Sequence, residues 1–193
     1  QHHLFPYINK PKEIHFYGAG VVNKEKVSII RHAFRSIYPD ASIEINNDML
    51  AAARSLLVNN EGIVGILGTG SNICYYDGQC IVNSVPPLGY IIGDEGSGAA
   101  LGKNLLGDYF KKIMPKEVER AFTEKFQLSQ SEALRNVYQK PKANQYLASF
   151  STFLSDYLNN EYCQKIVLNN FRAYIRRNVL QLPTNSKITI NFV

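Results

Sequence analysis

Apolar and polar positions follow two different periods in the first part of the chain. The run "EIHFYGAG" is rich in β-forming residues at positions 14–17 and ends at glycines, which predicts a short strand. Residues 23–38 instead carry apolar side chains three or four positions apart, as in an amphipathic helix. A second strand at residues 42–45 precedes the helix-like run "DMLAAARSLLV", with Asn47 or Asp48 at its N-cap position. The order β-α-β-α predicts parallel strands with helices packed on them.

The pattern changes after the polar tetrapeptide "NNEG", where three short apolar runs follow one another closely. They predict an antiparallel meander of strands at residues 63–67, 72–76 and 79–82, with Asp77-Gly78 as its second turn. The glycine-rich stretch "PPLGYIIGDEGSGAALGKNLL" then leads into a helix predicted at residues 97–113.

The remainder of the chain has mainly helical periodicity, and a last long helix is predicted at residues 161–179. Breaks between the helices are predicted near Pro115, Ser129 and Pro141. The run "KITINFV", residues 187–193, is expected to be a buried strand.

Charge and hydropathy limit the partners that the protein can have. The 21 Lys and Arg residues exceed the 16 Asp and Glu residues, but they are scattered in pairs and form no long stripe. This distribution favours solvated surface charge over a nucleic-acid-binding face. No apolar run approaches the roughly 18 residues of a membrane span, and no basic-then-apolar leader is present. We therefore expect neither a nucleic-acid nor a membrane partner.

The three cysteines have no spacing that is typical of metal ligands. Cys74 and Cys80 are expected to be small buried residues on adjoining strands, and Cys163 lies in a helical stretch. This usage indicates a reducing compartment, the cytoplasm, and no metal site in the chain.

Three polar clusters interrupt the apolar elements: residues 46–48 at a strand end, residues 68–72 at a hairpin, and residues 93–98 at the entry to a helix. Ligands of α/β proteins bind at the carboxyl ends of strands and in crevices between domains. We therefore expect the three clusters to meet across one cleft.

Each cluster has a chemical interpretation and a structural one. Asp48 could accept the proton of a hydroxyl that attacks a phosphoryl group, or serve only as a helix N-cap. The Gly-Thr-Gly run at residues 68–70 could cradle a phosphate, or simply make a hairpin turn. Asp94 and Glu95 could hold sugar hydroxyls, or complement the dipole of the following helix, which is the role we favour for Glu95. Lys103 could meet a phosphate, but a surface position suits a lysine better.

The pair "GILGTGSN" and "PPLGYIIGDEGSGAALG" resembles the N-acetylglucosamine kinase group, which is related to the BadF/BadG/BcrA/BcrD ATPase family within the actin-like ATPase and sugar kinase superfamily. The resemblance covers nearly the whole chain. It implies an α/β fold with two RNase H-like domains around a cleft. Residues 1–60 would be part of the first domain and residues 61–193 the second, with a helical insertion at about residues 115–160.

The resemblance also implies roles for individual residues. Asp48 would be the catalytic base facing the sugar 6-hydroxyl, and Thr69 would lie nearest the ATP phosphates. The implied phosphate-binding residues are Gly68, Thr69 and Gly70, and the implied sugar-binding residues are Ser71, Asn72, Pro87, Leu88, Gly89 and Asp94. ATP, Mg²⁺ and a small sugar would be the ligands, and a homodimer is compatible with the family.

Some parts of the family pattern differ here. Leu88 stands where animal members carry a tryptophan, and neither the first phosphate loop, Asp-x-Gly-x-Thr, nor the adenosine-binding glycine motif is found. We therefore expect an internal piece of a longer kinase, incomplete at both ends and inactive by itself. Two other functions remain open: an ATPase that activates a radical dehydratase or reductase, and a non-catalytic sugar sensor of the same fold.

Overall fold

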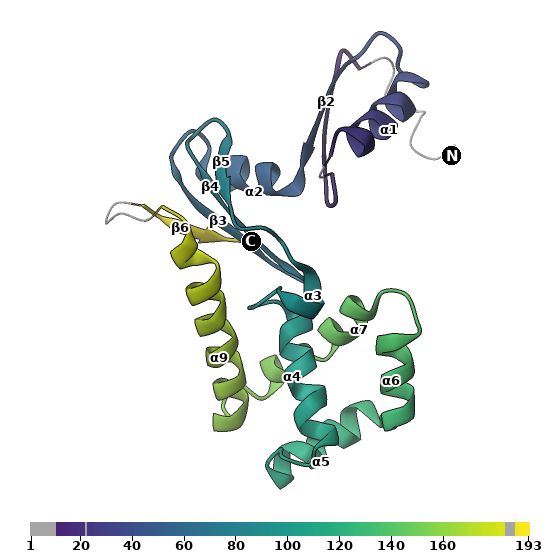
Figure 1. Ribbon diagram of the computed structural model, residues 1–193, viewed down its shortest axis with the longest axis vertical. Coiled ribbons are helices and arrows are strands. Elements are labelled where there is room, and N and C mark those ends of the chain that lie inside the picture. Colours follow the sequence, from purple (N-terminus) through teal and green to yellow (C-terminus); the bar gives the residue numbers. More distant parts are fainter. Residues whose placement is uncertain (1–10, 22, 184–187) are drawn as a thin grey trace.

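Two β-sheets and a group of helices follow one another along the long axis of the molecule (Figure 1). The computed structural model describes residues 11–21, 23–183 and 188–193. The elements in chain order are β1 (Glu13–Gly18), α1 (Lys24–Arg35), β2 (Ser42–Asn47), α2 (Asp48–Leu57), β3 (Gly62–Leu67), β4 (Ser71–Tyr76), β5 (Ile81–Ser84), α3 (Gly89–Ile92), α4 (Gly98–Phe110), α5 (Lys116–Phe126), α6 (Gln130–Tyr138), α7 (Ala143–Ser149), α8 (Thr152–Asp156), α9 (Glu161–Arg177) and β6 (Ile190–Phe192).

The first sheet pairs β1 and β2 in parallel, as the β-α-β pattern predicts, with Glu13 opposite Ser42 and Gly18 opposite Asn47. Helix α1 makes the crossover and packs on the sheet through Phe34, whose ring centroid lies 5.6 Å from that of Phe16. The carboxyl end of β2 runs directly into α2. The first polar cluster therefore lies at the junction of a strand with a helix.

The second sheet has the strand order β5-β4-β3-β6, with β3 antiparallel to β4 and parallel to β6. Successive side chains of a strand point to opposite faces. Ile63 of β3 accordingly packs with Tyr174 of α9, while Val64 packs with Ala53 of α2. One helix thus covers each face of this sheet, and the α/β class predicted from the sequence is confirmed.

The helical region is built around α4, which begins at Gly98, one residue after the predicted start, and ends at Phe110, three residues before the predicted end. Its core contains a cluster of aromatic rings in which Phe122 lies 5.1 Å from Phe153, centroid to centroid. The predicted breaks near Pro115, Ser129 and Pro141 all fall between helices. Among the described residues, none of the helices is long and apolar enough to cross a membrane.

Two strand predictions need correction. Strand β5 begins at Ile81, two residues later than predicted, because the Asp77 carboxylate accepts hydrogen bonds from the N–H groups of Gln79 and Cys80 and lengthens the turn. Cys80 therefore lies in the turn and is exposed, not buried on a strand. The buried strand expected at residues 187–193 is shorter and more exposed: β6 spans Ile190–Phe192, and residue 187 lies outside the described residues. Phe192 is 47% exposed, and among the described strands β6 pairs only with β3, which leaves it at the edge of the sheet.

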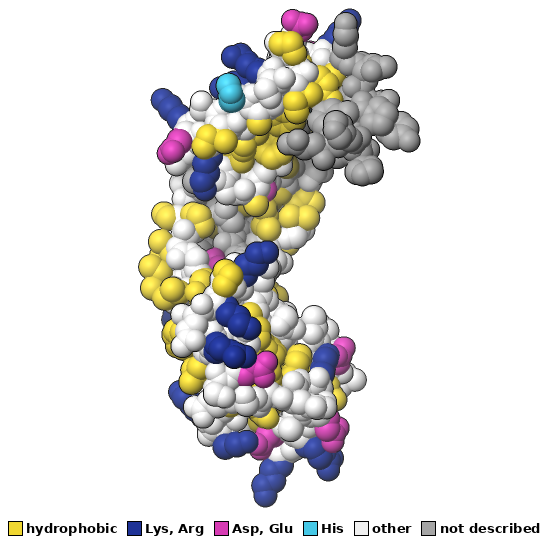
Figure 2. Space-filling model, turned by 90° about the vertical axis from the view of Figure 1, so that its right-hand side faces the viewer, with side chains coloured by type: hydrophobic (Ala, Val, Ile, Leu, Met, Phe, Trp, Pro, Cys, Tyr) yellow, Lys and Arg dark blue, Asp and Glu magenta, His cyan; other side chains and the backbone are white. Residues whose placement is uncertain are grey.

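The outer surface agrees with the charge pattern of the sequence. In the space-filling view the outline is elongated and curved, and Lys and Arg side chains are dispersed among apolar and acidic ones (Figure 2). No long basic stripe crosses the face that is shown. The view supports the interpretation of these residues as solvated surface charge.

Candidate functional site

The turn between β3 and β4, residues 68–70, is held from one side by the start of α4. The carbonyl of Gly68 accepts a hydrogen bond of 2.8 Å from the N–H of Gly98, and that of Thr69 accepts one of 3.1 Å from Ala99. The N–H of Gly68 donates to the carbonyl of Gly70 at 2.9 Å. Within the part of the chain that the structure describes, the N–H groups of Thr69 and Gly70 have no hydrogen-bond acceptor. Two consecutive backbone donors are therefore available to an anion.

The two glycines of this turn are needed for different reasons. A Cβ atom on Gly70 would lie 2.9 Å from a carboxylate oxygen of Asp94, so the close approach of that side chain requires glycine. A Cβ atom on Gly68 would meet nothing within 4 Å. Internal packing therefore does not explain Gly68, and the open space beside it would admit a ligand to the backbone.

Asp94 lies in the loop before α4 with a left-handed backbone, φ 57°. Its half-buried carboxylate lies near the backbone N–H of Ser71, the first residue of β4. Burial raises the pKa of Asp94 above its ordinary value, and the nearby charge of Glu95 acts in the same direction. Backbone strain and a destabilised charge at one residue are typical of a functional position.

Helix α9 holds both the start of β4 and the loop before α4 in place. The side-chain oxygen of Asn170 accepts a hydrogen bond of 3.1 Å from the N–H of Gly96, and the Tyr174 hydroxyl donates to the carbonyl of Asn72 at 3.3 Å. Gly96 has φ 79° and packs against Tyr174, so this position also requires glycine. Asn170 and Tyr174 carry no sequence signal for this role, because each occupies an ordinary buried position of a long helix.

Five of the six residues predicted to contact a sugar line one pocket of about 60 Å³. They come from the start of β4, the loop after β5 and the loop before α4: Ser71, Asn72, Pro87, Leu88 and Asp94. Gly89, the sixth, is the first residue of α3 and does not line the pocket. The second and third polar clusters of the sequence thus meet as predicted.

Glu95 has a role that the sequence analysis missed. Its carboxylate pairs with the Arg177 guanidinium at 2.6 Å and accepts a hydrogen bond of 3.3 Å from the Asn178 side chain. Arg177 and Asn178 also line the pocket. The preferred interpretation of Glu95, a charge that complements the helix dipole, is therefore incomplete, since the carboxylate ties the loop to the end of α9.

The first polar cluster lies apart from the other two. Asn47 is the N-cap of α2, since its side chain accepts from the N–H of Leu50 at 2.9 Å. Asp48 is the first helical residue, and its carboxylate accepts from the N–H of Met49 at 3.0 Å. Asp48 does not line the pocket that collects the sugar-site residues, whereas Asn46 and Asn47 line a separate pocket beside α1.

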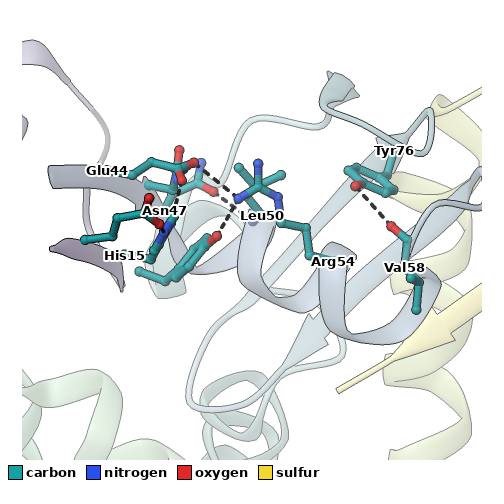
Figure 3. A network of polar contacts seen from close by, with 10 residues as sticks. His15, Glu44, Asn47, Leu50, Arg54, Val58 and Tyr76 are labelled. Carbon is teal, nitrogen blue, oxygen red and sulfur yellow. Dashed lines mark hydrogen bonds and ion pairs between the residues drawn. The ribbon is translucent and has the colours of Figure 1, made fainter. Parts of the chain in front are cut away.

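A polar network fixes the junction of β2 with α2 (Figure 3). The Glu44 carboxylate contacts the His15 ring nitrogen at 2.7 Å and accepts a hydrogen bond of 3.2 Å from Arg54, which also donates to the Tyr17 hydroxyl. The hydrogen bond from the Asn46 side chain lowers the pKa of Glu44 most, and contact with Glu44 raises the pKa of His15. The network joins β1, β2 and α2 and so holds Asp48 in a defined position.

The cysteines and carboxylates do not gather into a metal centre in the described part of the chain. No group of three or more His, Cys, Asp or Glu side chains there could hold a metal ion. Cys74 and Cys163 are buried and free, and burial raises the pKa of the Cys74 thiol to about 11. Cys74 therefore remains protonated and unreactive at neutral pH.

Comparison with known proteins reveals sugar kinases. The chain is 31% identical to the N-acetylmuramic acid/N-acetylglucosamine kinase of Clostridium acetobutylicum over 159 residues, which are 78% of this chain and 51% of that protein. No protein-family model matches the chain. The chain thus spans about half the length of this curated relative.

Solved structures that resemble this chain are also described as N-acetylglucosamine kinases. A provisionally assigned N-acetylglucosamine kinase from Porphyromonas gingivalis is 40% identical, with a TM-score of 0.88 over 94% of this chain and 64% of that one. A second provisional assignment, from Chromobacterium violaceum, has a TM-score of 0.64 at 20% identity over 90% of this chain and 61% of that one. The resemblance to N-acetylglucosamine kinases that the sequence predicts is confirmed.

Proposed function

We propose that this chain is part of an ATP-dependent sugar kinase that phosphorylates the 6-hydroxyl of N-acetylglucosamine or a related amino sugar. One observation carries the proposal: Thr69 and Gly70, whose N–H groups have no acceptor among the described residues, directly precede Ser71 and Asn72, which line the pocket with Asp94. A phosphate on the turn and a sugar in the pocket would be neighbours, as group transfer between two bound ligands requires. The similarity to named kinases supports this interpretation.

The turn at residues 68–70 would bind the ATP phosphates. Backbone N–H groups are suitable donors for an anion because the fold already fixes them, so no flexible side chain has to be ordered when the ligand binds. Thr69 would add a hydroxyl donor, and Gly68 would leave room for the phosphate to approach. The carbonyls of Gly68 and Thr69 are bonded to α4, which keeps their negative ends away from the ligand.

The pocket would bind the sugar. The Asp94 carboxylate can accept hydrogen bonds from ring hydroxyls, and the Asn72 amide can donate to a carbonyl or hydroxyl oxygen. Leu88 is 54% exposed and offers an apolar surface, without the stacking that an aromatic ring would give. Gly89 has φ 73° and open space at its Cβ position, so its proposed role is to let the substrate loop turn beside the sugar.

Asp48 would act as the general base. Its carboxylate would accept the proton of the sugar 6-hydroxyl while the oxygen forms a bond to the γ-phosphorus and the bond from that phosphorus to the bridging oxygen breaks, releasing ADP. Because Asp48 does not line the sugar pocket, this step needs a movement that brings the start of α2 to the pocket. The proposed two RNase H-like domains, residues 1–60 and 61–193 with a helical insertion, provide such a movement by closing their cleft.

Mg²⁺ would enter as part of the substrate MgATP. An ion of this kind is held by substrate phosphates, waters and one or two carboxylates, and needs no dedicated protein cage. The lack of a metal-binding group among the described residues is compatible with that mode. A cytoplasmic location, where ATP is available, and a homodimer complete the proposal.

The test is ADP release by the full-length protein with N-acetylglucosamine, glucosamine, N-acetylmannosamine, glucose or no sugar, each with wild type and Asp48→Asn. We expect release that depends on an amino sugar and is lost in the variant. ADP release at the same rate with and without sugar would indicate an activator-type ATPase instead of a sugar kinase. Sugar binding without any release would replace it with a sensor.

A further inference from the structure

A second pocket adjoins the proposed sugar pocket. It encloses about 330 Å³ and is lined by residues of α3, α4, α9 and the loop before α4. It shares Gly93, Glu95 and Arg177 with the sugar pocket, but no residue of the turn at 68–70 lines it. A ligand in the second pocket would therefore contact the wall of the sugar pocket while both the sugar and the ATP phosphates keep their proposed places.

The second pocket has an excess of positive charge. Lys103 and Arg177 line it, and the acid that lines it, Glu95, pairs with Arg177 at 2.6 Å. The Lys103 ammonium donates to the Tyr90 carbonyl at 3.3 Å, and no carboxylate of the described residues lies within ion-pair distance of it. An ammonium has three N–H donors, so Lys103 keeps donors for a ligand. The pocket is therefore suited to an anion.

A buried amide adds a donor to this pocket. Asn170 of α9 is 6% exposed and lines the pocket, and its side-chain oxygen accepts the hydrogen bond of the Gly96 N–H. The side-chain nitrogen has no acceptor in the part of the chain that the structure describes. A buried donor without an acceptor costs free energy, so a ligand that accepts a hydrogen bond from Asn170 would recover that cost.

The shape and the apolar part of the pocket indicate more than a bare ion. Its volume lies in the range of pockets that hold small organic molecules. Ile91 and Ile92 line one side and are 72% and 64% exposed, so they offer apolar surface to a carbon skeleton. A phosphate group suits the cations and the amides, because it combines negative charge with several acceptor oxygens. An organic phosphate monoester would satisfy both parts.

Occupation of the second pocket would act on the sugar pocket. An anion that binds the Arg177 guanidinium competes with Glu95 for it, and Glu95 is the neighbour of Asp94 in the loop that the ion pair holds. Burial raises the pKa of Asp94, and the charge of Lys103 partly offsets this effect. An anion on Lys103 would remove the offset. Both changes would oppose the acceptance of sugar hydroxyls by Asp94.

We infer that the second pocket is a regulatory site for a phosphate monoester, the chemical class of the product that the proposed reaction releases, and that its occupation weakens sugar binding. Lys103, Arg177 and Asn170 would hold the phosphate group. The weakening rests on the proposed function, because it assumes a sugar in the first pocket, whereas the binding of the monoester does not.

The test measures dissociation constants by calorimetry with the full-length protein and a saturating non-hydrolysable ATP analogue, which would occupy the turn at residues 68–70. The ligands are sn-glycerol 3-phosphate, inorganic phosphate and glycerol. Lys103→Gln removes the charge but keeps a donor for the Tyr90 carbonyl. Lys111→Gln is the matched control, since Lys111 follows α4 and does not line the second pocket.

We expect glycerol 3-phosphate to bind and glycerol not to bind. Lys103→Gln should raise the dissociation constant of glycerol 3-phosphate about tenfold, as the loss of a charge-assisted hydrogen bond predicts, and Lys111→Gln should leave it unchanged. Inorganic phosphate should bind more weakly, because it leaves the apolar side uncovered. Absence of binding, or equal binding by Lys103→Gln, would overturn the inference, and tighter binding of inorganic phosphate would assign the pocket to the free ion.

The coupling is measured with N-acetylglucosamine. Saturating glycerol 3-phosphate should raise the dissociation constant of the sugar about fivefold or more, and saturating sugar should raise that of glycerol 3-phosphate by the same factor. An unchanged sugar affinity would refute the regulatory role while the sugar still binds. If no sugar binds and none stimulates ADP release, the proposed function itself fails, and the comparison of wild type with Lys103→Gln still decides whether the pocket binds a monoester.

Discussion

Asp48 and Asn47 are neighbours with separable roles. Asn47 caps α2, whereas the Asp48 carboxylate, as far as the described residues go, accepts a hydrogen bond only from the N–H of Met49. We predict that Asp48→Asn lowers kcat/KM for the sugar by about 10²-fold to 10⁴-fold, the usual contribution of a general base, and leaves the unfolding free energy nearly unchanged. Steady-state kinetics and denaturant unfolding of the full-length protein measure the two effects.

Asn47→Ala is the matched control. It removes the cap and should lower the unfolding free energy by about 1 kcal/mol while it preserves the proton acceptor. If Asn47→Ala and Asp48→Asn reduced kcat/KM equally, the local geometry of the helix end and not the carboxylate would be the important feature.

The Asp94 carboxylate is predicted to lower the stability of the folded protein and to strengthen sugar binding. A raised pKa means that the folded state holds a proton more tightly than the unfolded chain, so stability falls as pH rises from the ordinary value of 3.8 through the raised pKa. The charged form of Asp94 is therefore destabilising. Asp94→Asn, which tolerates the left-handed backbone, should raise the melting temperature and weaken sugar binding by about tenfold or more.

The pH dependence of the same site provides a second measurement. Sugar binding should weaken as pH falls through the raised pKa of Asp94, because the protonated carboxyl loses acceptor capacity. In Asp94→Asn this acid-side dependence should disappear. A wild-type sugar affinity that stays constant down to pH 3.8 would contradict the role assigned to Asp94.

Residues of the site differ in how far the sequence could predict them. Gly70 and Asp94 lie in runs where glycines and acids interrupt apolar elements, and such local signals do not depend on distant parts of the chain. Arg177 and Asn178 come from the end of a helix more than eighty positions away, and Asn178 is 83 residues from its partner Glu95. Only the fold brings them to the pocket, so periodicity gave no sign of them.

Among the helices, two glycines of α4 should respond in opposite ways to substitution by alanine: one change should lower the unfolding free energy and the other should raise it. An ideal Cβ atom at Gly102 would lie 1.8 Å from the Leu147 carbonyl oxygen, where α4 crosses α7, whereas one at Gly107 would meet nothing within 4 Å. Gly102→Ala should lower the unfolding free energy by about 3 kcal/mol, because the helices must separate. Gly107→Ala should raise it by about 0.5–1 kcal/mol, the gain in helix propensity. Denaturant unfolding of both variants tests the contact, and equal effects would refute it.

The network at the start of α2 predicts a pH optimum for that element. The pKa of His15 is raised, so its interaction is fully present below pH 6.5 and is lost as pH rises through the raised value. The pKa of Glu44 is lowered, so its contribution is complete above pH 4.5 and is lost as pH falls through the lowered value. Amide exchange at α2 should therefore be slowest between pH 4.5 and 6.5, after correction for the intrinsic rate.

His15→Gln should remove the increase in exchange on the alkaline side. The control is His32→Gln, because His32 is also an exposed histidine but lies on α1. This variant should leave the alkaline increase in exchange unchanged. Both partners of the network are solvent-exposed, so the effect should also diminish at high salt. An alkaline increase that persists in His15→Gln would assign it to another group.

Element boundaries show where sequence patterns were sufficient. Strands β3 and β4 and the start of α4 follow from alternation, glycine and the Ser97 cap, and they lie within one or two residues of prediction. Strand β5 begins later than expected because the Asp77 carboxylate binds two backbone N–H groups and extends the turn. Such a side-chain contact competes with strand pairing and is not visible in hydrophobic alternation.

In the whole molecule, the residues proposed for catalysis and for ligand binding lie in two separate places. The turn at residues 68–70 joins β3 to β4 and adjoins the pocket proposed for the sugar, whereas Asp48 lies at the junction of β2 with α2. The sequence predicts that all three clusters meet, but the structure brings only two of them together. The proposed phosphoryl transfer therefore requires that the two proposed domains, residues 1–60 and 61–193, close around the bound ligands.

The most direct test of this claim is a crystal structure of the full-length protein with N-acetylglucosamine and a non-hydrolysable ATP analogue. We expect the sugar to contact Asn72 and Asp94, and the γ-phosphate to accept hydrogen bonds from the N–H groups of Thr69 and Gly70. The Asp48 carboxylate should lie about 3 Å from the sugar 6-hydroxyl. A sugar bound at another place, or Asp48 still outside hydrogen-bond reach with both ligands present, would contradict it.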